Sequence, residues 1–407
     1  MSSIALLMGL LGLSYLGTLI VGGRTARGLP SGVEFLGLGF IVGPHALGLV
    51  QREVVLEFEP VVQAGLGWLA FVVGLDFGRV GGRRVRNGPL ALGMTAACLV
   101  GVIVAVTVYL ALQRASVAAL DSRGAMLLAA GAGAVGAETT PLAVQWVAAR
   151  WGARGQLTDL LSQLASADDL VPVAASGAIF ALAPLPGLSV QLSASGWFLV
   201  TVGLGAILGT VTALLLRGAE GYQVWGALVG TLLLGVGTAA RFGLSTLLVT
   251  FVMGVALAAV SPARRTLRDM VRRTERSVFY PLLLLTGASI DIGVFSTHRG
   301  LYFVVGAAIV ARVLGKGLSS TVMLSVSPRA RAAGGRLPLA MLASGPVTVC
   351  TALAFAIRFP GAAGSVLLTT AATYAIIGEL VATYVLRRIL VDAGEIEAGA
   401  PSVGAGA

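Results

Sequence analysis

Long apolar segments separated by short polar ones run along almost the whole chain. Most are close to the 20 residues that a helix needs to cross the hydrocarbon of a bilayer. The predicted spans are 4–22, 33–50, 61–78, 89–112, 125–150, 157–183, 196–216, 223–240, 243–260, 278–295, 301–326, 337–358 and 361–386. The pattern therefore predicts an all-α polytopic membrane protein of about 13 transmembrane helices.

Composition supports this class and excludes others. Of the 407 residues, 57% are hydrophobic and only 11% are charged, whereas soluble proteins carry about 25% charged residues. The net charge of +10 comes from arginines clustered between apolar segments, so we expect cytoplasmic loops and no nucleic-acid partner. Two cysteines and two histidines, all far apart, give no metal or redox motif, and we expect no cofactor and no enzymatic activity.

The distribution of arginines predicts an orientation. If the N-terminus lies outside the cell, the inside loops hold twenty arginines and the outside loops hold six. This asymmetry follows the positive-inside rule and places the C-terminus in the cytoplasm. We expect one transmembrane domain over residues 1–390, in a cell membrane, and a short disordered tail over residues 391–407.

Two adjacent carboxylates, Asp168 and Asp169, lie inside the apolar run from Leu157 to Leu185. A charged side chain at membrane depth costs about 2.5–3.5 kcal/mol on insertion scales, so such residues usually serve a function. Pro172 has no N–H to donate, which leaves the carbonyl of Asp168 free if the segment is helical. These oxygens suit a small hard cation or protons. A helix end with two solvated aspartates is the alternative.

Lys316 is the only lysine of the protein, and it lies within the predicted span 301–326. A guanidinium cannot lose its proton in a protein, whereas a buried lysine can, so this choice suggests coupling to protons. A lysine that snorkels to the membrane surface is the alternative. Arg312 lies one turn earlier, on the same face of the helix. We interpret it as a structural ion-pair partner, and a residue that takes part in transport is the alternative.

Two spans contain polar residues and a proline near their middle, which predicts broken helices. The runs are Glu138-Thr139-Thr140-Pro141 and Ala343-Ser344-Gly345-Pro346-Val347-Thr348. Unwound backbone at this depth is tolerated only where protein buries it or where it lines a wet cavity. Glu138 and the threonine hydroxyl groups are expected to satisfy the ends of the half-helices. Ordinary proline kinks are the alternative.

The broken spans occupy corresponding positions in two trios of helices, at about 89–183 and 301–386. Interrupted helices in two corresponding halves indicate an inverted-repeat transporter, with its site where the broken helices cross. Glu379 is then the rough counterpart of the two aspartates. We assign no ion to it, and it is a candidate to balance Arg312.

Five segments carry a resemblance to a known family: Phe40–Gly48, Gly65–Asp76, Thr139-Thr140-Pro141, Asp168-Asp169 and Leu314-Gly315-Lys316. Together they resemble the monovalent cation:proton antiporter superfamily, in its sodium/hydrogen exchanger-like group with two adjacent aspartates. The resemblance implies a homodimer, six core helices that move against a dimerisation panel, and exchange of sodium or sometimes potassium for protons. Many relatives have an acid directly before the first proline, where this chain has Thr140, so the ion preference stays open.

The expected mechanism is competition between a cation and a proton for one site. Two buried carboxylates this close lose their protons in coupled steps. On the resemblance, Asp169 binds the cation directly, and Asp168 with Lys316 shares a second proton or forms an ion pair that opens. Thr139, Thr140 and free carbonyls complete the shell. The transported ions are Na⁺ (or K⁺ or Li⁺) and H⁺. Potassium/proton exchange, sodium-coupled symport of an organic anion and a non-transporting receptor are the alternatives.

Overall fold

The computed structural model describes residues 12, 30–50, 57–77, 79–80, 83–84, 87–115, 120–188, 190–217 and 222–397. The first predicted span, 4–22, lies outside these residues except for one position.

Almost every described element is a helix. In chain order these are α2 (Val33–Val42), α4 (Glu59–Asp76), α5 (Asn87–Ala115), α6 (Ser122–Ala137), α7 (Pro141–Trp151), α8 (Gln156–Asp168), α9 (Leu170–Leu182), α10 (Ala194–Leu215), α11 (Tyr222–Phe242), α12 (Thr246–Val260), α13 (Arg264–Arg272), α14 (Glu275–Ala288), α15 (Gly293–Thr297), α16 (Gly300–Val326), the 3₁₀ helix η1 (Ala330–Arg336), α17 (Leu337–Ala340), α18 (Pro346–Arg358) and α19 (Ala362–Asp392). A short hairpin joins α4 to α5. Its strands, β1 (Arg79–Val80) and β2 (Arg83–Arg84), have two residues each and pair antiparallel.

The structure confirms the all-helical, polytopic class. Eight helical segments are long and apolar enough to cross a membrane: Asn87–Ala115, Ser122–Trp151, Gln156–Leu182, Ala194–Leu215, Tyr222–Phe242, Ser277–Thr297, Gly300–Val326 and Ala362–Asp392. Each predicted span from the second onward overlaps one described helix or two consecutive ones. The count of thirteen is not confirmed, because α2, α12 and α18 are short and the first span is not described.

Local sequence sets where several helices begin. The side chain of Asp121 accepts a hydrogen bond from the backbone N–H of Gly124 at 2.8 Å, and Ser193 and Ser245 cap α10 and α12 in the same way. Such residues satisfy N–H groups that have no partner within their own helix. Proline opens α7 and α18, where a missing N–H does no harm.

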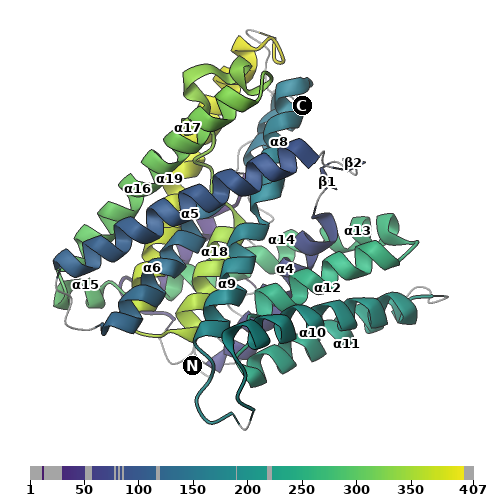
Figure 1. Cartoon of the computed structure of the whole chain (residues 1–407), viewed down its shortest axis with the longest axis vertical. Helices are drawn as coiled ribbons and strands as arrows, with labels where there is room; N and C mark the ends of the chain where they lie inside the picture. The colour runs from purple at the N-terminus through teal and green to yellow at the C-terminus, as the bar shows by residue number, and fades with distance from the viewer. Residues whose placement is uncertain are drawn as a thin grey trace.

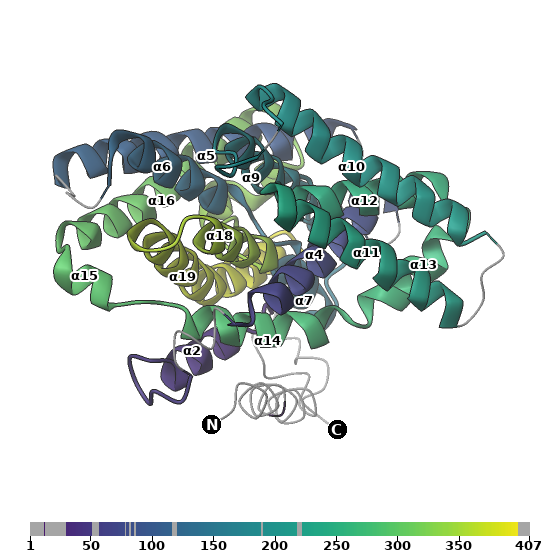
Figure 2. The same ribbon diagram turned by 90° about the horizontal axis from the view of Figure 1, so that it is seen from below.

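The helices form two groups. In Figure 2, α10–α13 lie beside α5, α6, α16, α18 and α19, and α14 and α2 lie along the lower edge. We call α5–α9 with α16–α19 the core group, and α2, α4 and α10–α14 the panel group. In Figure 1, α5 and α16 run alongside each other across the core group. Apolar side chains such as Trp68, Phe71 and Leu228 fill the interior of the panel group. The panel helices α4, α12 and α14 contact α18 at the boundary between the groups.

Close contact between α2 and α14 depends on glycines. A Cβ atom at Gly39 would lie 2.0 Å from the carbonyl oxygen of Leu284, and one at Gly287 would lie 2.1 Å from that of Leu36. The absence of side chains lets the two backbones approach, as is common between membrane helices. The rings of Phe35 and Tyr280 stack beside this contact, with their centroids 4.5 Å apart.

The two trios predicted from the sequence correspond to α5, α6–α7, α8–α9 and to α16, α17–α18, α19. In each trio the middle member is a broken helix, so the chain order agrees with the expected repeats.

The end of the described chain packs against α8. The domain boundary expected at residue 390 falls inside α19, which ends at Asp392, and the described chain continues to residue 397. The carboxylate of Glu395 accepts hydrogen bonds from the backbone N–H groups of Leu157 and Thr158, at 2.7 and 2.8 Å, and from the Thr158 hydroxyl at 2.6 Å. Ile396 is buried beside it. These contacts fasten the segment to the start of α8.

Candidate functional site

The first broken helix is interrupted over Glu138, Thr139 and Thr140. Helix α6 ends at Ala137, and the backbone of Glu138 (φ −66°, ψ 148°) and Thr140 (φ −72°, ψ 131°) is extended before α7 begins at Pro141. The hydroxyl oxygen of Thr140 accepts a hydrogen bond from the N–H of Leu142 at 3.3 Å. The proline predicted to break the span is thus the first residue of the second half-helix.

The second broken helix is interrupted over residues 341–345, and the two unwound stretches meet there. The backbone N–H of Thr140 donates to the carbonyl of Ala343 at 3.1 Å, and the hydroxyl of Thr139 donates to the carbonyl of Met341 at 3.2 Å. Backbone groups that leave their helices therefore find partners in the opposite break, as buried backbone requires.

Gly345 lets the two stretches come this close. A Cβ atom at this position would lie 2.3 Å from the hydroxyl oxygen of Thr140 and 3.1 Å from Oε1 of Glu138. Any side chain here would push the second stretch away from the first.

Glu138 is fully buried, and its side chain caps the N-terminus of α18. Its Oε2 atom accepts hydrogen bonds from the backbone N–H groups of Gly345 (3.0 Å) and Thr348 (3.1 Å) and from the Thr348 hydroxyl. Pro346 opens this half-helix, whose N-terminus carries a partial positive charge that favours an anion. The Oε1 atom has no hydrogen-bond partner among the described residues.

Two basic residues of α16 hold the end of α6. Arg312 donates from Nε to the carbonyl of Gly136 (3.2 Å) and from Nη2 to that of Glu138 (2.9 Å). Lys316 donates to the carbonyl of Ala137 (2.9 Å) and to the hydroxyl of Thr139 (2.5 Å). The positive charges thus lie at the C-terminal end of a half-helix, where its dipole is negative.

Asp168 lies opposite Lys316, with Oδ2 3.9 Å from the lysine Nζ. The helical path continues from α8 into α9, because Asp169 keeps helical backbone angles (φ −56°, ψ −30°). Pro172 lies in the first turn of α9 and provides no N–H to the carbonyl of Asp168. The Oδ1 atom of Asp168 has no hydrogen-bond partner in the described chain.

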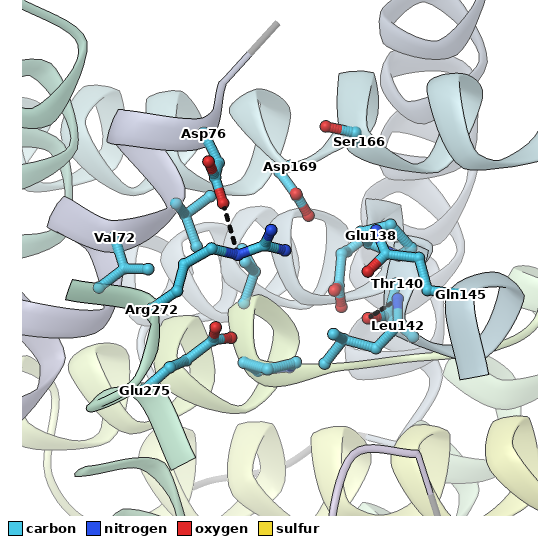
Figure 3. Close-up of a pocket in the computed structure, with 14 residues that line it drawn as sticks. Val72, Asp76, Glu138, Thr140, Leu142, Gln145, Ser166, Asp169, Arg272 and Glu275 are labelled. Atoms are coloured by element: carbon cyan, nitrogen blue, oxygen red, sulfur yellow. Dashed lines mark hydrogen bonds and ion pairs between the residues drawn. The ribbon is translucent and has the colours of Figure 1, made fainter. Parts of the chain in front are cut away.

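Asp169 lies on the wall of a cavity of about 70 Å³. The polar residues of the wall are Asp76, Glu138, Thr140, Gln145, Ser166, Asp169, Arg272 and Glu275. Figure 3 shows the carboxylate of Asp169 between the pair Asp76–Arg272 and Glu138. Only 6% of Asp169 is exposed, and its Oδ1 has no hydrogen-bond partner within the described ranges.

The buried charges at the crossing do not cancel. Glu138, Asp168 and Asp169 bring three carboxylates, whereas Arg312 and Lys316 bring two positive charges. Glu138 and Asp168 both repel a negative charge on Asp169. An uncompensated buried charge is costly, so this position favours a bound proton or cation.

Glu379 lies in α19, the last predicted span, and its described contact is outside the helix crossing. Its carboxylate accepts a hydrogen bond from the backbone N–H of Ser31, just before α2, and it is not among the described partners of Arg312. Arg312 instead has its guanidinium carbon 4.5 Å from the centre of the Tyr374 ring. Ser31 and Glu379 are far apart in the sequence, so a local sequence pattern could not predict their contact.

Sequence reasoning missed the residues at the mouth of the cavity. Asp76 was part of a motif without a role, and the arginines of 264–276 indicated only a cytoplasmic loop. One usable signal is the spacing of Arg268 and Arg272, which places both on one face of a helix. In the structure both contact Asp76.

Comparisons with known proteins give one family and structures with a similar fold. A family model described as "Sodium/hydrogen exchanger, transmembrane" matches residues 11–392. A structure of the sodium proton antiporter MjNhaP1 from Methanocaldococcus jannaschii at pH 8 is similar to the chain, with a TM-score of 0.67 at 16% identity, and covers 93% of this chain and 98% of that one. An electron-microscopy structure of the same antiporter gives a TM-score of 0.64 at 16% identity, covering 94% and 96%. A search of curated proteins finds no match.

Proposed function

Because the chain belongs to the sodium/hydrogen exchanger family, whose members are transporters and not enzymes, we propose that it exchanges sodium for protons. Asp169 is the residue that binds either ion. The sodium preference draws on the family description and on the sodium proton antiporter that the chain resembles in fold.

One observation carries the proposal. Asp169 is buried, borders a cavity beside the crossing of two broken helices, and has a carboxylate oxygen without a hydrogen-bond partner in the part described. A carboxylate in such a place needs a positive charge or a proton, and it cannot hold both at once. Competition for this oxygen converts one ion gradient into the other.

Neighbouring oxygens are suited to complete the shell. Ser166 and Thr140 border the same cavity as Asp169, and hydroxyl and carboxylate oxygens are the ligands that hard cations prefer. Thr139 is the less suitable of the two predicted threonines, because its hydroxyl already contacts Lys316 and Met341.

Asp168 and Lys316 have a different role in this proposal. They form an ion pair at the back of the site, and a change in that pair accompanies loading of Asp169. The 3.9 Å separation of their charged atoms supports this assignment.

We further propose alternating access in a homodimer, in which the core group moves against the panel group in a cell membrane. The distribution of arginines supports an N-terminus outside and a C-terminus in the cytoplasm. The mouth of the cavity, which Arg272 borders, then faces the cytoplasm.

Proton flux in proteoliposomes tests the proposal. Sodium, lithium and potassium are each added across a range of pH, and a pH-sensitive dye reports proton movement. Asp169→Asn should abolish cation-driven flux, whereas the matched control Asp159→Asn, an exposed position on α8, should keep it. Flux at the wild-type level in Asp169→Asn would refute the assignment.

The same assay separates the rival functions. Potassium/proton exchange predicts flux with potassium and little with sodium. Symport of an organic anion predicts sodium uptake without pH change and only when the solute is present.

A further inference from the structure

An arginine lies at the entrance to a cavity that we propose for cations. Arg272 is the last residue of α13, its side chain is 41% exposed, and it borders the cavity that reaches Asp169. Its Nε atom lies 3.0 Å from Oδ2 of Asp76, the last residue of α4. Figure 3 shows this pair on the side of the cavity across from Glu138, with Asp169 between them.

Arg272 is not needed to hold α13 against α4, because other contacts do so. Arg268 is 5% exposed, makes an ion pair with Asp76 and donates to the carbonyl of Leu75 at 3.3 Å. The indole N–H of Trp68 donates to the hydroxyl of Thr274 at 2.8 Å, on the other side of Arg272. Arg272 is thus a second positively charged partner of Asp76, which is already paired with Arg268.

Among the described residues that line the cavity, Arg272 is the one with a positive charge, and the other charged residues are the carboxylates Asp76, Glu138, Asp169 and Glu275. Arg272 and Arg268, which lies outside the lining, both pair with Asp76. A cleft with low-dielectric walls concentrates such a field and changes the local concentration of a charged ligand. The positive charge of Arg272 opposes the entry of a cation, and its ion pair with Asp76 offsets the negative charge of that carboxylate.

We propose that Arg272 is an electrostatic gate of this cavity, which lowers the affinity with which Asp169 takes a cation from the α13 side. The inference rests on the proposed function, and it adds a residue that tunes cation loading without contacting the bound ion.

Everted membrane vesicles, which expose the cytoplasmic face, test the gate through the sodium dependence of proton flux. Arg272→Gln should lower the KM for sodium about two- to fivefold, the size of a charge interaction across roughly 10 Å of partly aqueous medium. Arg272→Lys, which keeps the charge, should stay near the wild-type KM. The matched control Arg273→Gln removes an exposed neighbour outside the cavity wall, and its KM should not change.

A second measurement separates electrostatics from a change of shape. Raising the ionic strength with choline chloride should narrow the difference between wild type and Arg272→Gln, because salt screens a half-exposed charge. A difference that salt leaves unchanged would overturn the gate. Equal KM values for sodium in wild type and Arg272→Gln, with flux present in both, would also overturn the gate. Absence of sodium-driven flux in the wild type would overturn the proposed function, and the gate with it.

Discussion

The ammonium nitrogen of Lys316 lies 3.9 Å from Oδ2 of Asp168, and 3% of each side chain is exposed. Lys316 also donates to the carbonyl of Ala137 and the hydroxyl of Thr139, so its charge is fixed at the end of α6. Asp168 keeps one oxygen without a partner among the described residues. The lysine therefore links the aspartate helix to the first unwound stretch.

Replacing Lys316 by glutamine should weaken both charge movement and stability. The change leaves Asp168 as a buried charge without its partner, a loss that typically costs about 3–5 kcal/mol. We expect smaller currents on a supported membrane for a given sodium step, and a lower thermal midpoint in detergent. The double variant with Asp168→Asn should recover much of the midpoint. Unaltered currents in Lys316→Gln would contradict a role for this lysine in proton coupling.

Two buried threonines of α18 offer a matched pair for the role of Glu138. The hydroxyl of Thr348 donates to Glu138, whereas that of Thr351 has no hydrogen-bond partner in the described structure. Thr348→Val should destabilise the protein by about 1–3 kcal/mol, because it leaves the buried carboxylate one donor short. Thr351→Val should be neutral or stabilising. Thermal unfolding in detergent measures both, and equal midpoints would count against the bond.

The carboxylate of Glu395 caps the first turn of α8 from a distant part of the chain. Removing an N-terminal cap costs about 0.5–2 kcal/mol, and Glu395 contacts two N–H groups and a hydroxyl. Glu395→Ala should therefore lower the thermal midpoint, while the control Glu397→Ala, at an exposed position, should not. Faster hydrogen exchange at Leu157 and Thr158 should accompany the loss. Unchanged exchange there would show that the cap does not hold this turn.

The parts of the structure that follow from local pattern were predictable. Apolar runs predicted the helices, and polar residues within them, such as Asp168, Glu138 and Lys316, predicted the candidate site because charge at membrane depth is costly. Contacts between distant segments were not predictable, since Ser31 with Glu379 and Arg272 with Asp76 have no local signature. Helix α13 was not predicted, because a cluster of arginines is equally typical of a cytoplasmic loop.

The buried charges at the helix crossing carry a consequence for which ions the proposed site would accept. Arg312 offsets Glu138, and Lys316 offsets Asp168, which leaves one unit of negative charge on Asp169. A monovalent ion brings this total to zero. Calcium has almost the same ionic radius as sodium, yet it would leave a positive charge in a poorly polarisable interior, where charge is strongly disfavoured. In the proposed mechanism, the valence of a metal ion therefore matters before its size for binding at Asp169.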